Sequence, residues 1–528
     1  MSSPTATATQ PPLALLEALR EPAFYGVAGP VEVRETHASL VFLAGEHVYK
    51  LKKPVSFGFL DYSTPARRRL MCRREVELNR RLAPGVYLGV VPVKQHPGGF
   101  ALGGAGRTVD YLVHMRRLDD TASLAAMIER GGATEDLVRR TAREIAEFHG
   151  KAERGTRIDA FGRPAAIARN HAEHFAQVRP FVGVAISEAT FAEISTAAHR
   201  FIREERATLL ARVAGGHIRD GHGDIRAEHV YLQDGIAIID CIEFNRRFRY
   251  ADTAADLAFL SMDLTALGVP GLARALVDEY QRASNDDVGP VLSFYSSYRA
   301  FTRGKVACLK WARPGRADGA RETALAEARR FFHLSLKYAR GDTRPVLMLM
   351  AGLTGTGKST LAAALRAVLP AQVITADEVR KRIAGVPAGA HRNDPLDSGL
   401  YSHTMNKQVY DALLSAAEDA LRLGQDVILD ATYRRRADRE AARSLAGRIG
   451  AAFNAVECLA PEAVVRERID RRLTEGSVWS DGRWEVYLQQ RAAFEPLDEL
   501  PARERIAVDA ALPIFGQVGR VLEHIEHG

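Results

Sequence analysis

A short glycine-rich motif, GLTGTGKS at residues 352–359, has the residue types and spacing that bind a phosphate group. Glycines let successive backbone N–H groups point at one phosphate, Lys358 is expected to reach the β- and γ-phosphates, and the Ser359 hydroxyl is expected to bind Mg²⁺. The apolar run 346–351 and the helix-forming residues 361–369 predict the strand, loop and helix that such a motif requires. The motif predicts ATP binding, with an ordinary glycine-rich turn as the alternative. The loop residues expected to contact the nucleotide are Gly352, Leu353, Thr354, Gly355, Thr356, Gly357, Lys358, Ser359 and Thr360.

A carboxylate follows the next predicted strand, residues 371–376. Asp377 at this position is expected to accept the proton of a substrate hydroxyl that attacks the γ-phosphate. Arg380 lies about one helical turn further on and is expected to neutralise the transferring phosphoryl group. The alternative is that Asp377 only caps the following helix.

A second carboxylate ends the buried strand predicted at residues 425–432. Asp430 is expected to hold a magnesium-bound water, because an apolar strand that ends in an acid commonly accompanies a phosphate-binding loop. Thr432, together with Arg434 or Arg436, is expected to border the substrate.

Arginines are concentrated in the helix predicted at residues 461–473. Arg468 and Arg472 are four residues apart and therefore share one face, as a lid that closes over the γ-phosphate requires. A solvated basic face, with Glu467 and Asp470 as partners, is the alternative.

The first two-thirds of the chain contain another candidate pair of carboxylates. Asp224 lies in the sequence His-Gly-Asp at residues 222–224, and Asp240 ends a short strand after an intervening turn. Such a hairpin-like unit would allow one carboxylate to accept a hydroxyl proton and the other to hold Mg²⁺. A turn stabilised by local side-chain hydrogen bonds is the alternative.

These residues, together with Asp252 and Asp256-Leu257-Ala258, resemble the aminoglycoside phosphotransferase (choline-kinase-like) branch of the protein-kinase-like fold, over roughly residues 39–262. The resemblance implies that Asp224 is the catalytic base and that Asp240 binds Mg²⁺.

The same resemblance implies that Lys50 pairs with the nucleotide phosphates and with Glu75, and that residues 113–116 contact adenine. Lys52 competes with Lys50 for this role, because residues two apart on a strand share a face. The Asn metal ligand of the family is replaced by His229, and imidazole is a poor match for Mg²⁺. An active enzyme and a regulatory domain therefore both remain open for this region.

Residues 345–528 resemble the group of kinases that includes gluconate kinase, polynucleotide 5′-kinase and the zeta-toxin sugar-nucleotide kinases. The order of the two regions resembles a bacterial fusion of an aminoglycoside-phosphotransferase-like domain to a P-loop ATPase/kinase domain. The fold class expected is an α+β, two-lobed, protein-kinase-like domain followed by an α/β P-loop domain with a parallel sheet.

Length and composition agree with several globular domains. The 528 residues exceed what one core supports, 46% are hydrophobic, and the net charge of +7 is too dispersed to indicate a nucleic-acid partner. We expect a disordered lead-in at residues 1–12, a kinase-like domain at 13–340 and a P-loop domain at 345–528. The four cysteines are far apart, and no apolar run is long enough for a membrane helix, so a cytoplasmic protein is expected.

The sequence thus predicts an ATP- and Mg²⁺-dependent phosphotransferase acting on a hydroxyl of a small molecule. The region at residues 13–340 is expected to be a second phosphotransferase or a regulator. A nucleotide switch that hydrolyses ATP without an acceptor and a polynucleotide 5′-hydroxyl kinase are the alternatives.

Overall fold

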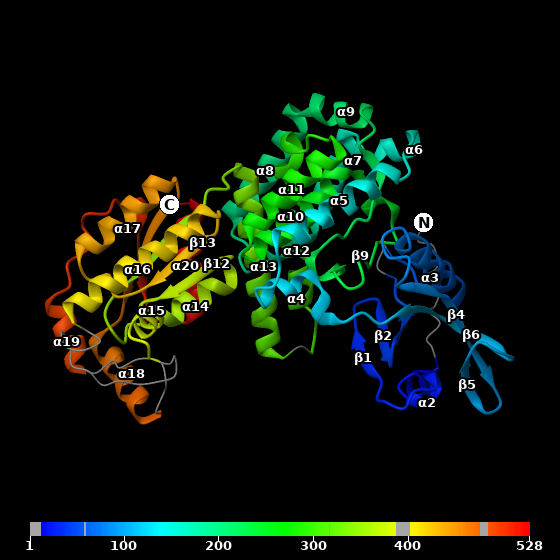
Figure 1. Ribbon diagram of the computed structural model, residues 1–528, viewed down its shortest axis with the longest axis horizontal. Coiled ribbons are helices and arrows are strands. Elements are labelled where there is room, and N and C mark those ends of the chain that lie inside the picture. Colours follow the sequence, from blue (N-terminus) through cyan, green and yellow to red (C-terminus); the bar gives the residue numbers. More distant parts are fainter. Residues whose placement is uncertain (1–11, 57–59, 316, 387–401, 476–483, 528) are drawn as a thin grey trace. The chain divides into compact units, whose positions relative to one another are not determined.

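The computed structural model describes residues 12–527 apart from 57–59, 316, 387–401 and 476–483, and the side chains of residues 472–475 are also outside the description (Figure 1). Except for Pro12, the lead-in predicted at residues 1–12 lies outside these ranges. Chain contacts divide the protein into two compact units. The first comprises Met1–Asn170, Phe201–Asp263 and Leu272–Ser296, and the second comprises His171–Arg200, Leu264–Gly271 and Ser297–Gly528. The second unit combines part of the helical region with the P-loop region, and the domain boundary at residues 341–345 stays a prediction.

The first unit contains a six-stranded antiparallel sheet with the order β1-β2-β3-β6-β4-β5. Its strands are β1 (Glu32–Glu35), β2 (Ser39–Ala44), β3 (His47–Lys52), β4 (Tyr87–His96), β5 (Gly99–Leu102) and β6 (Arg107–Arg116). The sequence predicts all of these strands except β1, whose residues Glu-Val-Arg-Glu are mostly charged and exposed. Two short helices, α1 (Leu13–Ala18) and α2 (Pro22–Tyr25), precede the sheet.

Helix α3 (Pro65–Asn79) packs on this sheet and carries Glu75. Its first turn is capped by Thr64, whose hydroxyl accepts a hydrogen bond from the backbone N–H of Arg67. The buried guanidinium of Arg68 donates to Asp110 on β6 at 2.8 to 3.1 Å, which ties the helix to the sheet. Because both charges are almost fully buried, loss of either partner leaves an uncompensated charge.

Helices dominate the chain from Ser123 onward, as the sequence predicts. These helices are α4 (Leu124–Glu129), α5 (Glu135–Lys151), α6 (Thr156–Asp159), α7 (Pro164–Val178), α8 (Glu188–Glu204), α9 (Arg206–Ala214), α10 (Thr253–Ala266), α11 (Pro270–Ser284), α12 (Gly289–Trp311) and α13 (Asp318–Arg340). Between α9 and α10 the antiparallel pair β8 (Val230–Tyr231) and β9 (Ala237–Ile238) forms the hairpin-like unit that the sequence predicts. Strands β7 (Ile218–Asp220) and β10 (Tyr250–Asp252) pair on either side of it in sequence.

The second unit contains a five-stranded, entirely parallel sheet with the order β12-β13-β11-β14-β15. Its strands are β11 (Val346–Ala351), β12 (Ala371–Thr375), β13 (Asp426–Asp430), β14 (Ala452–Leu459) and β15 (Arg505–Asp509). The chain first adds strands on one side of β11 and then on the other, so the strand order reverses at β11. In open α/β sheets the crevice at the carboxyl ends of the strands, beside such a reversal, is where ligands bind.

Helices cover both faces of this sheet (Figure 1). The helices of this region are α14 (Lys358–Val368), α15 (Ala376–Ile383), α16 (His403–Arg422), α17 (Arg436–Ile449), α18 (Glu462–Glu475), α19 (Trp484–Ala492) and α20 (Ile514–His527), of which α18 and α19 pack on each other beside Leu353 of the loop after β11. Leu347 and Leu349 of β11 pack in the core with α16 and α17, whereas Met348 and Met350 pack with α14 and α20. The central strand is therefore apolar on both faces, as expected for a buried parallel strand. None of the described helices combines the length and the apolar composition that spanning a bilayer requires.

Replacement of a residue in the central strand tests how far this core holds the phosphate loop in place. Leu349 is fully buried in β11. We expect Leu349→Ala to lower the free energy of unfolding of the second unit by about 2–5 kcal/mol, since it removes methylene contacts and leaves a cavity. Urea unfolding would measure the change. Leu423→Ala is the control, because this leucine after α16 is 58% exposed. It should change the free energy of unfolding by less than about 0.5 kcal/mol. Equal losses of stability in the two variants would contradict this view of the core.

Candidate functional site

The loop after β11 has a backbone that requires glycine at several positions. Gly352, Gly355 and Gly357 have φ values of 138°, 78° and 97°, a region that other residues rarely adopt. A Cβ atom on Gly352 would lie 2.7 Å from the carbonyl oxygen of Cys458, and one on Gly355 would lie 2.9 Å from a methyl group of Val465. Space and backbone conformation together exclude side chains here, so the loop presents its backbone, as a phosphate-binding loop does.

A lysine, a hydroxyl and a carboxylate gather beside this loop. Lys358 is buried at the start of α14, and its Nζ donates to the backbone oxygen of Leu353 at 2.7 Å. Strand β13 lies next to β11 in register, which brings its last residue, Asp430, level with Met350. Burial raises the pKa of Asp430, whereas the Lys358 ammonium and a hydrogen bond from Ser359 lower it.

Asp377 and Arg380 lie on α15, directly after β12. The cap of α15 is Thr375, whose hydroxyl accepts from the backbone N–H of Glu378 at 3.2 Å. The alternative in which Asp377 is only a helix cap is therefore wrong. Asp377 forms an ion pair with Lys381 at 3.1 Å, and Arg380 donates to the side-chain oxygen of Asn406 at 3.1 Å.

Arg468 on α18 reaches the phosphate loop from the other side. Its guanidinium donates to the backbone oxygens of Thr356 at 3.4 Å and of Ala510 at 2.7 Å. This contact places a cation at the loop, where the sequence predicts one. Arg472 lies in the same helix, but its side chain is outside the described part of the structure.

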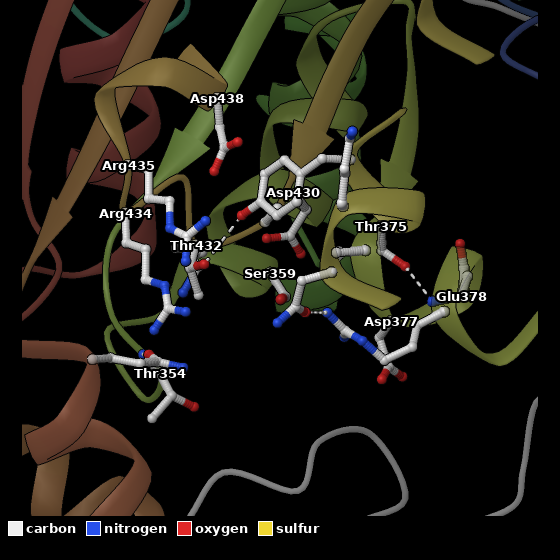
Figure 2. A pocket seen from close by; sticks show the side chains of 18 of the residues that line it. Thr354, Ser359, Thr375, Asp377, Glu378, Asp430, Thr432, Arg434, Arg435 and Asp438 are labelled. Carbon is white, nitrogen blue, oxygen red and sulfur yellow. Dashed lines mark hydrogen bonds between the residues drawn. The ribbon is translucent and has the colours of Figure 1, made fainter. Parts of the chain in front are cut away.

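These groups face a cavity of about 760 Å³ (Figure 2). Its polar and charged lining includes Thr354, Lys358, Ser359, Asp377, Glu378, Arg380, Asn406, Tyr410, Asp430, Thr432, Arg434, Arg435 and Asp438. Thr432 and Arg434 border the cavity, as the sequence predicts. Arg436, the predicted alternative to Arg434, instead pairs with Asp498 and Glu499, and Arg435 lies in the cavity lining.

Sequence reasoning missed the lining residues of α16 and of the start of α17. Asn406 and Tyr410 belong to no motif and come to the cavity only because α16 crosses this end of the sheet. The run of three arginines at residues 434–436 directly after an acid-ended strand was a usable signal. The sequence alone could not show that Arg434 and Arg435 line the cavity whereas Arg436 pairs with Asp498.

The residues around the loop fit magnesium and a nucleotide phosphate. A side chain has no room at Gly352 or Gly355, so the backbone of the loop can approach phosphate oxygens closely at these positions. Ser359 and Asp430 supply the oxygen ligands that Mg²⁺ prefers, and Lys358 supplies a cation next to them. The predicted roles of the loop residues, including Leu353, Thr354, Thr356 and Thr360, stay predictions.

In the first unit, both candidate lysines of β3 contact the same glutamate. Lys50 Nζ lies 2.9 Å from Glu75 and 2.9 Å from Asp240, and the buried Lys52 pairs with Glu75 at 2.5 Å and with Glu243. Burial would raise the pKa of Glu75, but the two lysines hold it below its ordinary value. Lys50 likewise holds the pKa of Asp240 well below its usual range. The implied Lys50–Glu75 pair is present, and only Lys50 of the two lysines also contacts Asp240.

Asp256 positions the loop that carries Asp224. The carboxylate of Asp256 accepts from the backbone N–H groups of His222 at 2.7 Å and Gly223 at 2.8 Å. Gly223 has a φ of 89°, and a Cβ there would lie 2.7 Å from the carbonyl oxygen of Phe248. Two buried hydrogen bonds and a glycine-only turn thus set the direction of Asp224.

An arginine that sequence reasoning overlooked holds Asp224. Arg226 donates to both carboxylate oxygens of Asp224, at 3.0 and 3.1 Å, and to Nε2 of His229 at 2.9 Å. His229 Nδ1 in turn donates to the backbone oxygen of Asp224 at 2.9 Å. Burial, and then the charge of Arg226, lower the pKa of His229, so the ring is neutral.

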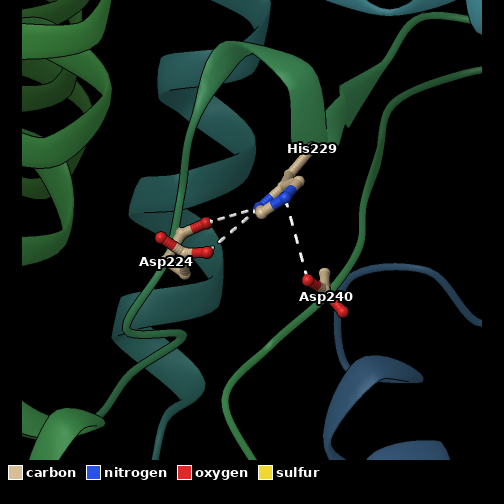
Figure 3. A group of neighbouring side chains, drawn as sticks. All are labelled: Asp224, His229 and Asp240. Atoms are coloured by element: carbon tan, nitrogen blue, oxygen red, sulfur yellow. Dashed lines mark hydrogen bonds and ion pairs between the residues drawn. The ribbon is translucent and has the colours of Figure 1, made fainter. Parts of the chain in front are cut away.

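Asp224, His229 and Asp240 come close together (Figure 3). Nε2 of His229 lies 3.8 Å from a carboxylate oxygen of Asp240. Mg²⁺ takes oxygen ligands in an octahedral shell. Here the carboxylate of Asp224 is paired with Arg226, that of Asp240 is paired with Lys50, and the third group is the imidazole of His229. These residues fit Mg²⁺ poorly, and the roles implied for Asp224 as base, Asp240 as metal ligand and residues 113–116 as hinge stay predictions.

Residues 347–497 match the family model described as an AAA domain, which confirms the P-loop family predicted for the C-terminal region. Over 444 residues the chain is 36% identical to the Mycobacterium tuberculosis protein described as "Uncharacterized protein Rv2004c", covering 84% of this chain and 86% of that protein. The Mycobacterium bovis protein Mb2027c matches with the same values.

Solved structures of lower similarity also match. A gluconokinase from Sinorhizobium meliloti is 21% identical with a TM-score of 0.24, covering 34% of this chain and 91% of its own. The Mycobacterium tuberculosis APS kinase in complex with AMPPNP and APS is 20% identical with a TM-score of 0.26, covering 35% of this chain and 98% of its own. A choline/ethanolamine kinase family protein from Mesorhizobium loti is 16% identical with a TM-score of 0.34, covering 62% of this chain and all of its own.

Substitution of a loop glycine tests whether the cradle binds nucleotide. We expect Gly355→Ala to weaken ATP binding by at least about tenfold, because an alanine Cβ would collide with Val465 and disfavour the φ of 78°. Isothermal titration with ATP and Mg²⁺ would measure the affinity. Gly447→Ala is the matched control and should keep the affinity of the wild type, since a Cβ at that position on α17 meets no neighbouring residue within 4 Å. Unchanged affinity in Gly355→Ala would argue against a phosphate-binding cradle.

Proposed function

The chain belongs to the same family as the mycobacterial protein Rv2004c, and on that premise we propose that it is an ATP-dependent kinase whose C-terminal domain phosphorylates a hydroxyl of a small molecule. One observation carries this proposal. Lys358 and Ser359 on α14, Asp377 on α15 and Asp430 on β13 come from three different segments and meet around one cavity. A nucleotide switch needs all of these groups except Asp377, whose carboxylate in the same cavity suits a base for the hydroxyl of a bound acceptor.

Each residue in this proposal has a distinct task. The loop N–H groups and Lys358 bind the β- and γ-phosphates; Ser359 and Asp430 would hold magnesium, which would supply positive charge beside the phosphates. Asp377 accepts the proton of the acceptor hydroxyl as its oxygen bonds to the γ-phosphorus. The bond from that phosphorus to the β–γ bridging oxygen breaks, and ADP leaves. Arg468, with Arg380, stabilises the negative charge on the phosphoryl group during transfer.

Transfer of labelled γ-phosphate tests the proposal directly. ATP would be offered with a bacterial metabolite extract and, separately, with a 5′-hydroxyl oligonucleotide. We expect a labelled small molecule, and we expect Lys358→Ala to lower its formation by at least about 100-fold, because a charged contact to the phosphates is lost. Arg366→Ala, on the exposed side of the same helix, is the control and should retain activity.

The other outcomes of that assay separate the alternative functions. Label on the oligonucleotide alone would assign a polynucleotide 5′-kinase. ATP hydrolysis that Lys358→Ala abolishes, without any labelled acceptor, would assign a nucleotide switch and refute the kinase proposal.

We further propose that the N-terminal domain is a regulator and not a second phosphotransferase. The observation that favours this role is that Arg226 pairs with both carboxylate oxygens of Asp224, whereas among the described residues Asp377 in the C-terminal cavity has a single ion pair, from Lys381 to one of its oxygens. The pairing of Asp240 with Lys50 similarly occupies the implied metal ligand.

The activity of Lys358→Ala also tests this second proposal. With the C-terminal site disabled, we expect no transfer of label to an aminoglycoside panel, to choline or to the metabolite extract, because the N-terminal carboxylates are already paired. Scintillation counting of separated products would measure it. Residual product that disappears in the double variant Lys358→Ala/Asp224→Asn would show instead that the N-terminal domain is a phosphotransferase.

A further inference from the structure

Arg434 differs from the other arginines that follow β13. Arg436 pairs with Asp498, Arg439 with Glu499 and Arg443 with Glu504. Among the described residues, no hydrogen bond or ion pair holds the guanidinium of Arg434, although it lies in the cavity lining and is only partly exposed. A guanidinium presents five donors and has no acceptor, so a partly enclosed one calls for an anionic or carbonyl partner.

The backbone before Arg434 is held in an unfavourable conformation. Tyr433 is fully buried and has a φ of 43°, which is rare for a bulky residue and costs on the order of 1–3 kcal/mol. Its N–H donates to the hydroxyl of Tyr410 at 3.2 Å, and its carbonyl oxygen accepts from Arg439 at 2.9 Å. These contacts keep the turn in one conformation, so the direction of Arg434 into the cavity is built into the fold.

The fully buried Arg439 supports this turn in several directions. Besides Tyr433, it donates to the carboxylate of Glu499 at 2.6 and 2.9 Å and to the backbone oxygen of Pro496. The backbone oxygen of Arg434 itself accepts from the N–H of Glu495 at 2.9 Å. The segment after α19 thus fixes the turn from outside the cavity. A solvated surface arginine needs no such support.

A second cation lies beside Arg434, and it contacts a histidine instead of a carboxylate. Arg435 meets Nε2 of His403 at 3.1 Å. In the view of Figure 2, Arg434 and Arg435 lie on one side of the cavity and Asp377 and Glu378 on the other, with Ser359 and Asp430 between them. Asp438 is the nearest acid in sequence, and no ion pair joins it to either arginine among the described residues; burial raises its pKa, and the two arginines lower it.

We propose that the acceptor is an anion, and that Arg434 and Arg435 bind its carboxylate or phosphate group while its hydroxyl lies at the phosphate loop. The inference rests on the proposed kinase function and names the substrate class of that site. Two oxygens of either group match the paired N–H donors of a guanidinium. The hydroxyl of Thr432, which lies 3.2 Å from that of Tyr410, borders the same cavity.

Fractionation of the extract distinguishes an anionic acceptor from a neutral one. A metabolite extract would be passed over a strong anion exchanger, and the retained and unretained fractions would be offered separately with labelled ATP. We expect the labelled product in the retained fraction. Treatment of that fraction with alkaline phosphatase, removed before the assay, separates the two sources of charge: a phosphate monoester loses its acceptor capacity, whereas a carboxylate keeps it.

Three variants then test the arginine. Arg434→Met should raise the KM for the purified acceptor on the order of 100-fold with a smaller change in kcat, because the anion loses its charged partner. Arg434→Lys should recover part of this loss, since it restores charge without the planar fork. Arg436→Met, two residues away and paired at the surface, is the matched control and should have the KM of the wild type. Titration of the acceptor into ADP-bound protein would give the same ranking without turnover.

The assay distinguishes failure of the anion proposal from failure of the kinase proposal. Product formed only from the unretained fraction would overturn the anion proposal and leave the kinase proposal standing. A fall in kcat at constant KM in Arg434→Met would overturn it as well, because the arginine would then stabilise the transferring phosphoryl group. No product from either fraction would overturn the kinase function and this inference together.

Discussion

The glycine-only backbone after β11 is the constraint on which the rest of the C-terminal site depends. The loop passes so close to Cys458 and Val465 that side chains at Gly352 and Gly355 would overlap with their atoms. This tight path ends at Lys358, the first residue of α14, and so sets where the lysine and the helix N-terminus lie. The neighbouring strand β13 then brings Asp430 to the same point, because parallel strands in register end together.

The two candidate sites handle buried charge in different ways. In the first unit, Lys50, Lys52, Glu75, Asp240 and Glu243 compensate one another, and Arg226 compensates Asp224. Each charge therefore has its partner within the chain. In the C-terminal cavity, Arg434 lacks such a partner among the described residues, and Asp430 keeps a raised pKa despite the nearby Lys358. Charges that the fold leaves uncompensated mark the place where a ligand supplies the counter-charge.

This contrast underlies the different roles proposed for the two regions, each of which carries kinase-like residues. The N-terminal cluster has the positions of a phosphotransferase, but Arg226 and His229 change its chemistry from an open pair of carboxylates to a closed network of hydrogen bonds. Such a network favours one fixed arrangement of the loop. The C-terminal cavity instead combines fixed donors with open space, which catalysis on a bound substrate requires.

Local sequence determined much of this protein. Propensity and apolar periodicity predict β11, β13 and α14, because these elements are decided by residues adjacent in the chain. The loop motif predicts Lys358 and Ser359 for the same reason. Strand β1 was missed because three of its four residues are charged, and such a run lacks the apolar alternation of a typical strand.

Tertiary structure alone decided which distant residues meet. Asn406 and Tyr410 reach the cavity because α16 packs on the sheet, and Arg434 enters the cavity directly after a turn in which Tyr433 has a positive φ. That turn is stabilised by Arg439 and Glu499, which are 60 residues apart. Long-range packing and strained backbone leave little trace in a local pattern, so the sequence indicated the part of the cavity proposed to bind phosphate, and the fold decided the part proposed to bind the acceptor.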